Sequence, residues 1–378
     1  MMSDRFVFHR SLQPQQFTSQ QQAEFASAVQ ASDASLEILP VLSPRQLQLL
    51  PNGLTADGFR FDAVGFAQVA AAISPGLAQA MRDLADPPAR RGVLSRTAHG
   101  DYARRCWNDI VRLRLDDLRA QGWQLVLQTN ARLICGLITG TYHCFGGSAL
   151  YVHAETAMTQ QPYQFYAAQL RGLSTQLWYR SSSPEVVRAS AVENWSLRRG
   201  WYFASGEVGR TAARASLALF TPYGICLGPY RQYGRRVWHA RRAFEGRWQT
   251  ALRKLLSQDW QLPWESLGTR LSRPLGFAEY TSAGSRRKYR AKWLRAIQRD
   301  GLPRDLASGV LSQTLQFGAA HRLPAVPSEY VVWGSRTLYD LFRVLLTVAS
   351  RLPVAKREAA EQVAFEILVG SLPLPGGT

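Results

Sequence analysis

Residues 123–156 read WQLVLQTNARLICGLITGTYHCFGGSALYVHAET, and their composition differs from that of the preceding sequence. Short runs of Val, Ile, Leu, Tyr and Thr are interrupted by Asn, Gly-Gly and Gly-Thr, which is typical of β-hairpins. The stretch 133–154 is long enough to span a membrane, but its glycines and β-forming residues favour hairpins over a helix in lipid. Similar runs continue to about residue 229, so the sequence predicts an antiparallel β-sheet in the middle of the chain.

The sequence before this region is predicted to be helical. Residues 62–73 and 102–121 repeat apolar side chains with the period of an amphipathic helix, and Gly122 is suited to end the second helix. Residues 36–122 are therefore interpreted as a mainly helical N-terminal region. Residues 1–35 are rich in Gln and Ser and are expected to form a polar, flexible leader or a short polar helix.

Helical periodicity returns after the middle region. The sequence predicts a β-rich core over residues 123–248 and a helical C-terminal region over residues 249–378, which ends in a helix pair broken at Pro353. The expected fold class is α+β, with a helical N-terminal third, an antiparallel β-sheet in the middle and a helical C-terminal segment.

The charge of the chain is strongly basic and unevenly distributed. Lys and Arg number 45 against 27 acidic residues, which gives a net charge of +18. Residues 181–300 contain 22 basic and 8 acidic residues, so this third of the chain carries +14 of that charge. Most of the cations are arginine, whose planar guanidinium binds phosphate in bidentate fashion and stacks on bases. A polyanion, and nucleic acid above all, is the expected partner.

An Arg/aromatic ribbon occupies residues 228–248, GPYRQYGRRVWHARRAFEGRW. It contains six arginines, five aromatic residues and one acid, Glu245. Guanidinium groups beside aromatic rings are the combination that single-strand binders use to hold phosphates and stack bases. The alternative is that the rings belong to the core and the arginines form a solvated rim. The predicted phosphate contacts are Arg231, Arg235, Arg236, Arg241 and Arg242, and the predicted stacking residues are Tyr230, Tyr233 and Trp238.

A second basic segment covers residues 286–299, RRKYRAKWLRAIQR, and is predicted to be a helix. It lacks the acidic residues at i±4 that commonly balance such a face, although a solvated helix is the alternative interpretation. Its predicted phosphate contacts are Arg286, Arg287, Lys288, Arg290 and Lys292. The two basic segments are expected to converge into one continuous groove when the chain folds.

No motif indicates catalysis, a metal or a cofactor. The chain has no Walker A, GxGxxG, GxSxG or HExxH sequence. The set Cys135, His143, Cys144 and His153 has the ligand types of zinc, but its spacing matches no known zinc motif, so buried cysteines are expected instead. The four cysteines show no CxxC spacing and the first residues lack the apolar core of a signal peptide, which favours a cytoplasmic protein.

Residues 207–229, EVGRTAARASLALFTPYGICLGP, followed by His239 in a basic context, resemble the central signature of the phage/plasmid-like "domain of unknown function 932" family. The terminal segments RTLYDLFRVLLTVASRL and REAAEQVAFEIL resemble that family's last helices. Thr221–Gly224 and Arg343 depart from the family pattern, which has Cys-Thr-Asn-Gly and Asn there. The resemblance implies a role in the biology of mobile elements and, at the level of fold, similarity to single-strand annealing proteins.

The sequence therefore predicts a non-enzymatic protein of phage or plasmid type that binds single-stranded DNA, with an annealing or recombination-associated role. Expected partners are nucleic acid and, in an annealing protein, further copies of the chain or a nucleoprotein complex. Three alternatives stay open. They are an RNA- or duplex-DNA-binding subunit of a larger assembly, a metal-dependent nuclease, and an interaction protein whose charge serves an acidic partner.

Overall fold

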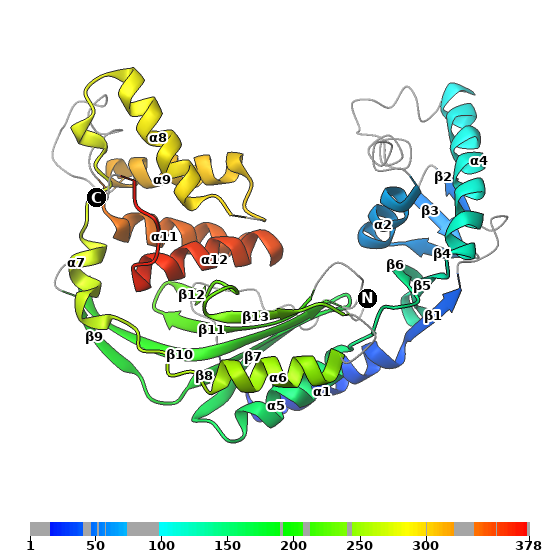
Figure 1. The fold of residues 1–378 in the computed structure, drawn as a ribbon, viewed down its shortest axis with the longest axis horizontal. Coiled ribbons are helices and arrows are strands. Elements are labelled where there is room, and N and C mark those ends of the chain that lie inside the picture. Colours follow the sequence, from blue (N-terminus) through cyan, green and yellow to red (C-terminus); the bar gives the residue numbers. More distant parts are fainter. Residues whose placement is uncertain are drawn as a thin grey trace.

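The computed structural model describes residues 16–40, 47–50, 53–56, 58–73, 98–189, 192–206, 212–239, 244–299, 301–320, 336–352 and 354–375. The α+β class is confirmed, with helical N- and C-terminal regions and sheets between them (Figure 1). None of the helices in the described part of the chain combines the length and apolar character that a membrane crossing requires.

The first sheet has six strands in the order β1-β5-β6-β4-β3-β2. Its strands are β1 (Leu36–Pro40), β2 (Leu47–Leu50), β3 (Gly53–Ala56), β4 (Phe59–Phe61), β5 (Trp123–Gln128) and β6 (Leu133–Thr139). The predicted hairpin at residue 123 is the β5–β6 pair, whose turn places Arg132 at φ 51°. The N-terminal third thus combines its helices with four short strands, whose prolines and glycines obscure the sequence pattern of a strand.

Helices α2 (Ala63–Ile73) and α4 (Ala98–Ala120) pack against this sheet. Their bounds are close to those of the helices predicted over residues 62–73 and 102–121. Their buried residues Val69 and Leu118 share a small core with Leu125 and Ile134 of the sheet. Burial of one apolar face is what stabilises amphipathic helices of this length.

Helix α1 (Ser19–Ala34) shows that this part of residues 1–35 is the helix that the sequence left open and not a flexible leader. Thr18 and Gln21 form a capping box at its first turn, in which each side chain bonds the other residue's backbone N–H. Phe25 and Val29 are fully buried in the main core. The polar composition belongs to the outward face, and two apolar residues four positions apart are enough to hold the helix against the sheet.

Helix α5 (Gly147–Met158) replaces the last part of the β-hairpin structure predicted for residues 123–156. The carboxylate of Asp33, at the end of α1, accepts hydrogen bonds from the backbone N–H groups of Gly147 (3.1 Å) and Ser148 (2.8 Å). A Cβ atom on Gly147 would lie 2.2 Å from the Thr175 hydroxyl, so the glycine permits close packing on the sheet. Tertiary contacts therefore override the local β-propensity.

The second sheet is antiparallel throughout and has seven strands. They are β7 (Tyr163–Arg171), β8 (Ser174–Ser181), β9 (Glu185–Ala189), β10 (Val192–Gly206), β11 (Ala213–Thr221), β12 (Gly224–Leu227) and β13 (Gly234–Val237). The main path runs β12-β11-β10-β8-β7, β13 also pairs with β11, and β9 pairs with β10. This is the antiparallel sheet predicted for the middle of the chain.

Helices lie on both sides of the second sheet (Figure 1). Helices α1, α5 and α6 (Phe244–Leu256) lie against one face, and α11 (Leu338–Ala349) and α12 (Val354–Val369) lie on the other side. The remaining C-terminal elements are η4 (Trp264–Ser266), α7 (Leu267–Leu271), η5 (Phe277–Glu279), α8 (Ala283–Ile297) and α9 (Arg304–Ala320). Helix α8 and the pair α11–α12 agree with the predicted helices.

Candidate nucleic-acid interface

The Arg/aromatic ribbon begins directly after strand β12 and contains strand β13, and both strands lie at the edge of the second sheet. Strand β12 pairs with residues 218–221 of β11, and β13 pairs with residues 213–216 of the same strand. Between them, Leu217 accepts the N–H of Gly228 (2.8 Å) and donates its own N–H to the carbonyl of Tyr233 (2.9 Å). Residues 229–232 therefore bulge out of an edge that continues on both sides of them.

The side chain of Tyr230 points into the molecule, which corrects its prediction as a base-stacking residue. It is 9 % exposed, and its hydroxyl donates to Oε2 of Glu358 on α12 at 3.0 Å. Tyr202 donates to Oε1 of the same carboxylate (2.6 Å), and Nη1 of Arg214 donates to Oε2 (2.7 Å). A ring used in this way cannot receive a base from solvent.

Burial and the Glu358 carboxylate raise the pKa of both Tyr202 and Tyr230 well above its ordinary value. For Arg214, burial acts to lower the pKa, but the adjoining carboxylate outweighs it and the pKa is raised. The tyrosines thus stay protonated as donors while Arg214 stays charged. The cluster is a buried ion pair whose carboxylate also accepts hydrogen bonds from two tyrosines. Charged groups can be buried in a protein when they are paired and hydrogen-bonded in this way.

We define an edge patch as Arg231, Arg235, Arg236, Trp238 and Arg247, which lie in β13, beside it and in the first turn of α6. The guanidinium carbon of Arg236 lies 4.5 Å from the centroid of the Tyr230 ring, in cation–π geometry. The side chains of Arg231 and Arg236 are exposed, and Trp238 is 60 % exposed. Nη2 of Arg247 donates to the Trp238 carbonyl at 3.3 Å, which joins the first turn of α6 to the patch.

Several predicted contacts of the ribbon differ from the expectation. Tyr233 is half-buried, with ring centroids 4.8 Å from Phe365 and 5.1 Å from Trp260, so it packs in the protein and is not a free stacking surface. Arg235 is half-buried and donates to the Gly234 carbonyl (2.7 Å). Arg241 and Arg242 lie outside the described residues. Arg247 belongs to the patch but was not predicted, because helix α6 begins inside the ribbon and turns this side chain back toward β13.

His239 anchors the end of β13 from inside. Its backbone carbonyl accepts the N–H of His143 (3.1 Å), its Nδ1 lies 3.1 Å from the His143 carbonyl, and its ring stacks on Tyr142. Burial lowers the pKa of His239 from 6.5 to about 4, so the ring is neutral at pH 7. The described residues contain no group of three or more His, Cys, Asp or Glu side chains placed to hold a metal ion.

Helix α8 carries the second basic segment. Arg287, Lys288, Lys292 and Arg295 are exposed, whereas Tyr289, Trp293 and Ile297 are buried. Two of the predicted phosphate ligands bond within the chain. Arg290 donates to the hydroxyls of Ser308 (3.0 Å) and Ser312 (2.6 Å), and Arg286 donates to the Thr281 carbonyl (2.6 Å). The α8 stripe, defined as the four exposed cations, is what remains on the surface.

The two basic segments do not come together. Strand β13 runs along the second sheet, whereas α8 lies beyond α9 at the outer end of the C-terminal helices (Figure 1). This corrects the expectation of one continuous groove made by both segments. The folded chain presents an edge patch and a separate α8 stripe.

Comparisons with protein-family models, with curated proteins and with solved structures found no match to this chain. The resemblance to the "domain of unknown function 932" family therefore stays a prediction that depends on the residues quoted for it.

Proposed function

We propose that this protein binds nucleic acid without catalysis, and that it holds single-stranded DNA at the edge patch. The observation that carries the proposal is the exposed indole of Trp238 among arginines at a sheet edge. Burying a large apolar side chain is worth about 1.5–3 kcal/mol, so an indole left in water forgoes a substantial stabilisation. Stacking on an unpaired base recovers it, at roughly 1–3 kcal/mol per base.

The charges around Trp238 support the same partner. Glu245 is the one acid in residues 228–248, and its Oε1 lies 3.8 Å from Nε2 of His143. Glu358 is buried beneath Tyr230 and is already paired with Arg214. Neither carboxylate neutralises the outward guanidinium groups of Arg231 and Arg236, which leaves them able to contact phosphates.

Single-stranded DNA is favoured over duplex DNA because the patch offers the exposed ring of Trp238 as a surface on which an unpaired base can stack. Bases in a duplex already stack on one another, whereas a single strand can place a base on an exposed side chain. The resemblance to the "domain of unknown function 932" family, with its implied fold-level similarity to single-strand annealing proteins, supports a role in annealing or recombination of a mobile element. The α8 stripe offers a second contact to strands long enough to reach it.

The test is a polarisation titration of a labelled dT oligonucleotide at several salt concentrations. We expect Trp238→Ala to weaken binding about 5- to 150-fold, the loss of one stacked base. Arg236→Ala should lower the slope of log K against log[salt] by about 0.7, the share of one phosphate contact to a single strand. Arg119→Ala, an equally exposed arginine on α4, is the matched control and should change neither quantity.

Competition with other nucleic acids and a cleavage assay distinguish single-stranded DNA binding from binding of RNA or duplex DNA and from nuclease activity. Duplex DNA and RNA of the same length should compete more weakly than the dT strand. Equal or stronger competition by either would replace the single-stranded DNA assignment. Cleavage of labelled DNA in Mg²⁺ or Mn²⁺ that is lost on substitution of one Asp or Glu would show a nuclease. A salt-independent affinity, or a Trp238→Ala variant that binds normally, would refute the proposed interface.

A further inference from the structure

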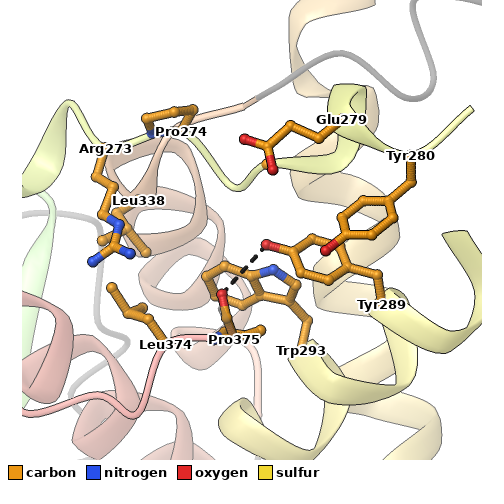
Figure 2. A pocket seen from close by; sticks show the side chains of 10 residues that line it. Arg273, Pro274, Glu279, Tyr280, Tyr289, Trp293, Leu338, Leu374 and Pro375 are labelled. Carbon is orange, nitrogen blue, oxygen red and sulfur yellow. Dashed lines mark hydrogen bonds between the residues drawn. The ribbon is translucent and has the colours of Figure 1, made fainter. Parts of the chain in front are cut away.

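A pocket of about 250 Å³ lies between α8, η5 and the end of the chain (Figure 2). Its walls are aromatic on one side, where Tyr280 and Tyr289 stack with ring centroids 4.3 Å apart and Trp293 lies beside them. Leu338 and Leu374 form the opposite wall. A concave site lined by aromatic and aliphatic side chains, with polar groups exposed among them, is a form that small-ligand sites take.

The backbone that shapes this pocket is held firmly. Leu275 accepts hydrogen bonds from the Tyr289 hydroxyl (2.8 Å) and from Nε1 of Trp293 (3.2 Å). Gly276 follows at φ 76°, a conformation that favours glycine, and a Cβ there would lie 2.9 Å from the Tyr289 hydroxyl oxygen. The turn at Leu275–Gly276 is therefore packed closely against the side chains of Tyr289 and Trp293.

Two residues of opposite charge line the pocket from opposite sides. Figure 2 shows Arg273 on the side of the leucines and Glu279 on the side of the tyrosines. Both side chains reach solvent, so they stand at the mouth. Burial raises the pKa of the Tyr289 hydroxyl, the hydrogen bond from Trp293 lowers it, and Tyr280, Glu279 and Arg273 have smaller effects.

We propose that this pocket receives a guanine base. Guanine is the base that presents a two-donor edge, N1–H and the N2 amino group, together with a two-acceptor edge, O6 and N7. A carboxylate accepts in bidentate fashion and a guanidinium donates in bidentate fashion, so Glu279 and Arg273 match these two edges. Adenine and cytosine offer Glu279 one amino group beside acceptors. Uracil and thymine offer one N–H between two carbonyl oxygens, which repel a carboxylate.

The size of the pocket and its position both suit a base of a bound strand. Sites for drug-sized ligands occupy roughly 300–1,000 Å³, so this smaller pocket holds one base and leaves sugar and phosphate outside. Tyr289 and Trp293 come from α8, which also carries the exposed Lys288 and Lys292 directly before them in the chain. The sugar-phosphate backbone of a DNA strand bound along the α8 stripe can thus turn one base toward the aromatic wall. This placement rests on the proposed function.

The first experiment measures mononucleotides by calorimetry, which does not depend on strand binding. GMP should bind more tightly than AMP, CMP and UMP by about 5- to 150-fold, the discrimination that one bidentate base contact provides. Glu279→Gln should abolish this preference, because an amide presents a donor where guanine has two donors. Glu265→Gln, an exposed glutamate in the comparable short helix η4, is the matched control and should leave the preference unchanged. Equal binding of the four nucleotides would overturn the proposal.

The second experiment separates this inference from the proposed function. A dT oligonucleotide with one central dG should bind more tightly than dT alone, and Glu279→Gln should remove only that difference. Trp238→Ala should weaken both oligonucleotides and leave GMP binding intact. If GMP binds but neither oligonucleotide does, the pocket stands and the strand-binding function fails. If both oligonucleotides bind equally and GMP does not bind, the function stands and the guanine pocket fails.

Discussion

The edge patch and the α8 stripe are both rich in cations, but the fold treats their arginines differently. At the edge, the carboxylate of Glu358 lies beneath the surface and is used by Arg214, Tyr202 and Tyr230, so the outer arginines keep their charge toward solvent. On α8, Arg290 is bonded to serines of α9, and the lysines carry much of the exposed charge. Composition alone does not reveal which cations a ligand can reach. The buried neighbours decide it.

The largest expected effect concerns the carboxylate beneath the edge patch. Glu358→Ala leaves Arg214 as an unpaired buried cation, and we expect a loss of about 3–5 kcal/mol in the free energy of unfolding. Glu366→Ala is the matched substitution on the same helix, since Glu366 pairs with Arg299, which is more exposed than Arg214. It should cost clearly less in urea denaturation. Equal losses would contradict the difference between the two regions.

His239 should make the edge of the sheet sensitive to acid. Its pKa is about 4 in the folded protein against an ordinary value of 6.5. The unfolded chain therefore binds the proton first, so this contribution is complete above pH 6.5 and is lost as the pH falls toward 4. The difference between the two pKa values corresponds to about 3 kcal/mol in the free energy of unfolding.

Urea denaturation of the wild type and of His239→Gln at pH 7 and pH 4.5 measures this effect. The loss of stability on acidification should be smaller in the variant, because glutamine does not titrate. An identical loss in both proteins would show that other groups govern the acid response.

Two glycines near α8 should respond to alanine with opposite signs. Gly276→Ala imposes a positive φ on a residue with a Cβ and pushes it against the Tyr289 hydroxyl, so we expect a loss of about 1–2 kcal/mol. Gly284→Ala lies in the first turn of α8 with open space around it and should gain up to about 1 kcal/mol. Thermal or urea unfolding gives both values, and a neutral Gly276→Ala would mean that the turn is not constrained.

The smallest expected effect separates the exposed and internally bonded cations of α8. Lys292→Ala should lower the salt slope for a long oligonucleotide by about 0.7. Arg290→Ala should leave the slope unchanged, because its guanidinium is bonded to Ser308 and Ser312. Polarisation titrations over a salt series measure both. A larger change for Arg290 than for Lys292 would reverse the assignment of the reachable cations.

Sequence patterns predicted the elements whose signals are local. The β5–β6 hairpin, helix α8 and the α11–α12 pair follow from runs of apolar residues, turn residues and helical periodicity. Helix α5 did not, because its first N–H groups are satisfied by Asp33, which is 114 residues away in the chain. A cap supplied from so far leaves no trace in the surrounding sequence.

The sequence predicted the residue types of the candidate site, but it did not predict which of its side chains face solvent. Six arginines in 21 residues are by themselves an indication of an anion-binding surface. Which rings face solvent depends on partners distant in sequence, since Tyr230 is drawn inward by Glu358 and Tyr233 by Trp260 and Phe365. Trp238 is the stacking candidate that stays exposed.

The bond between Asp33 and the start of α5 also has a consequence for the order of folding. Helix α1 is synthesised before α5, so its buried Phe25 and the carboxylate of Asp33 find their partners only after α5 and the strands beyond it have been made. Closing so long a loop is slow compared with forming a helix or a hairpin. Assembly of the large sheet is therefore expected to be a late step, during which the nascent N-terminal helix depends on protection from aggregation.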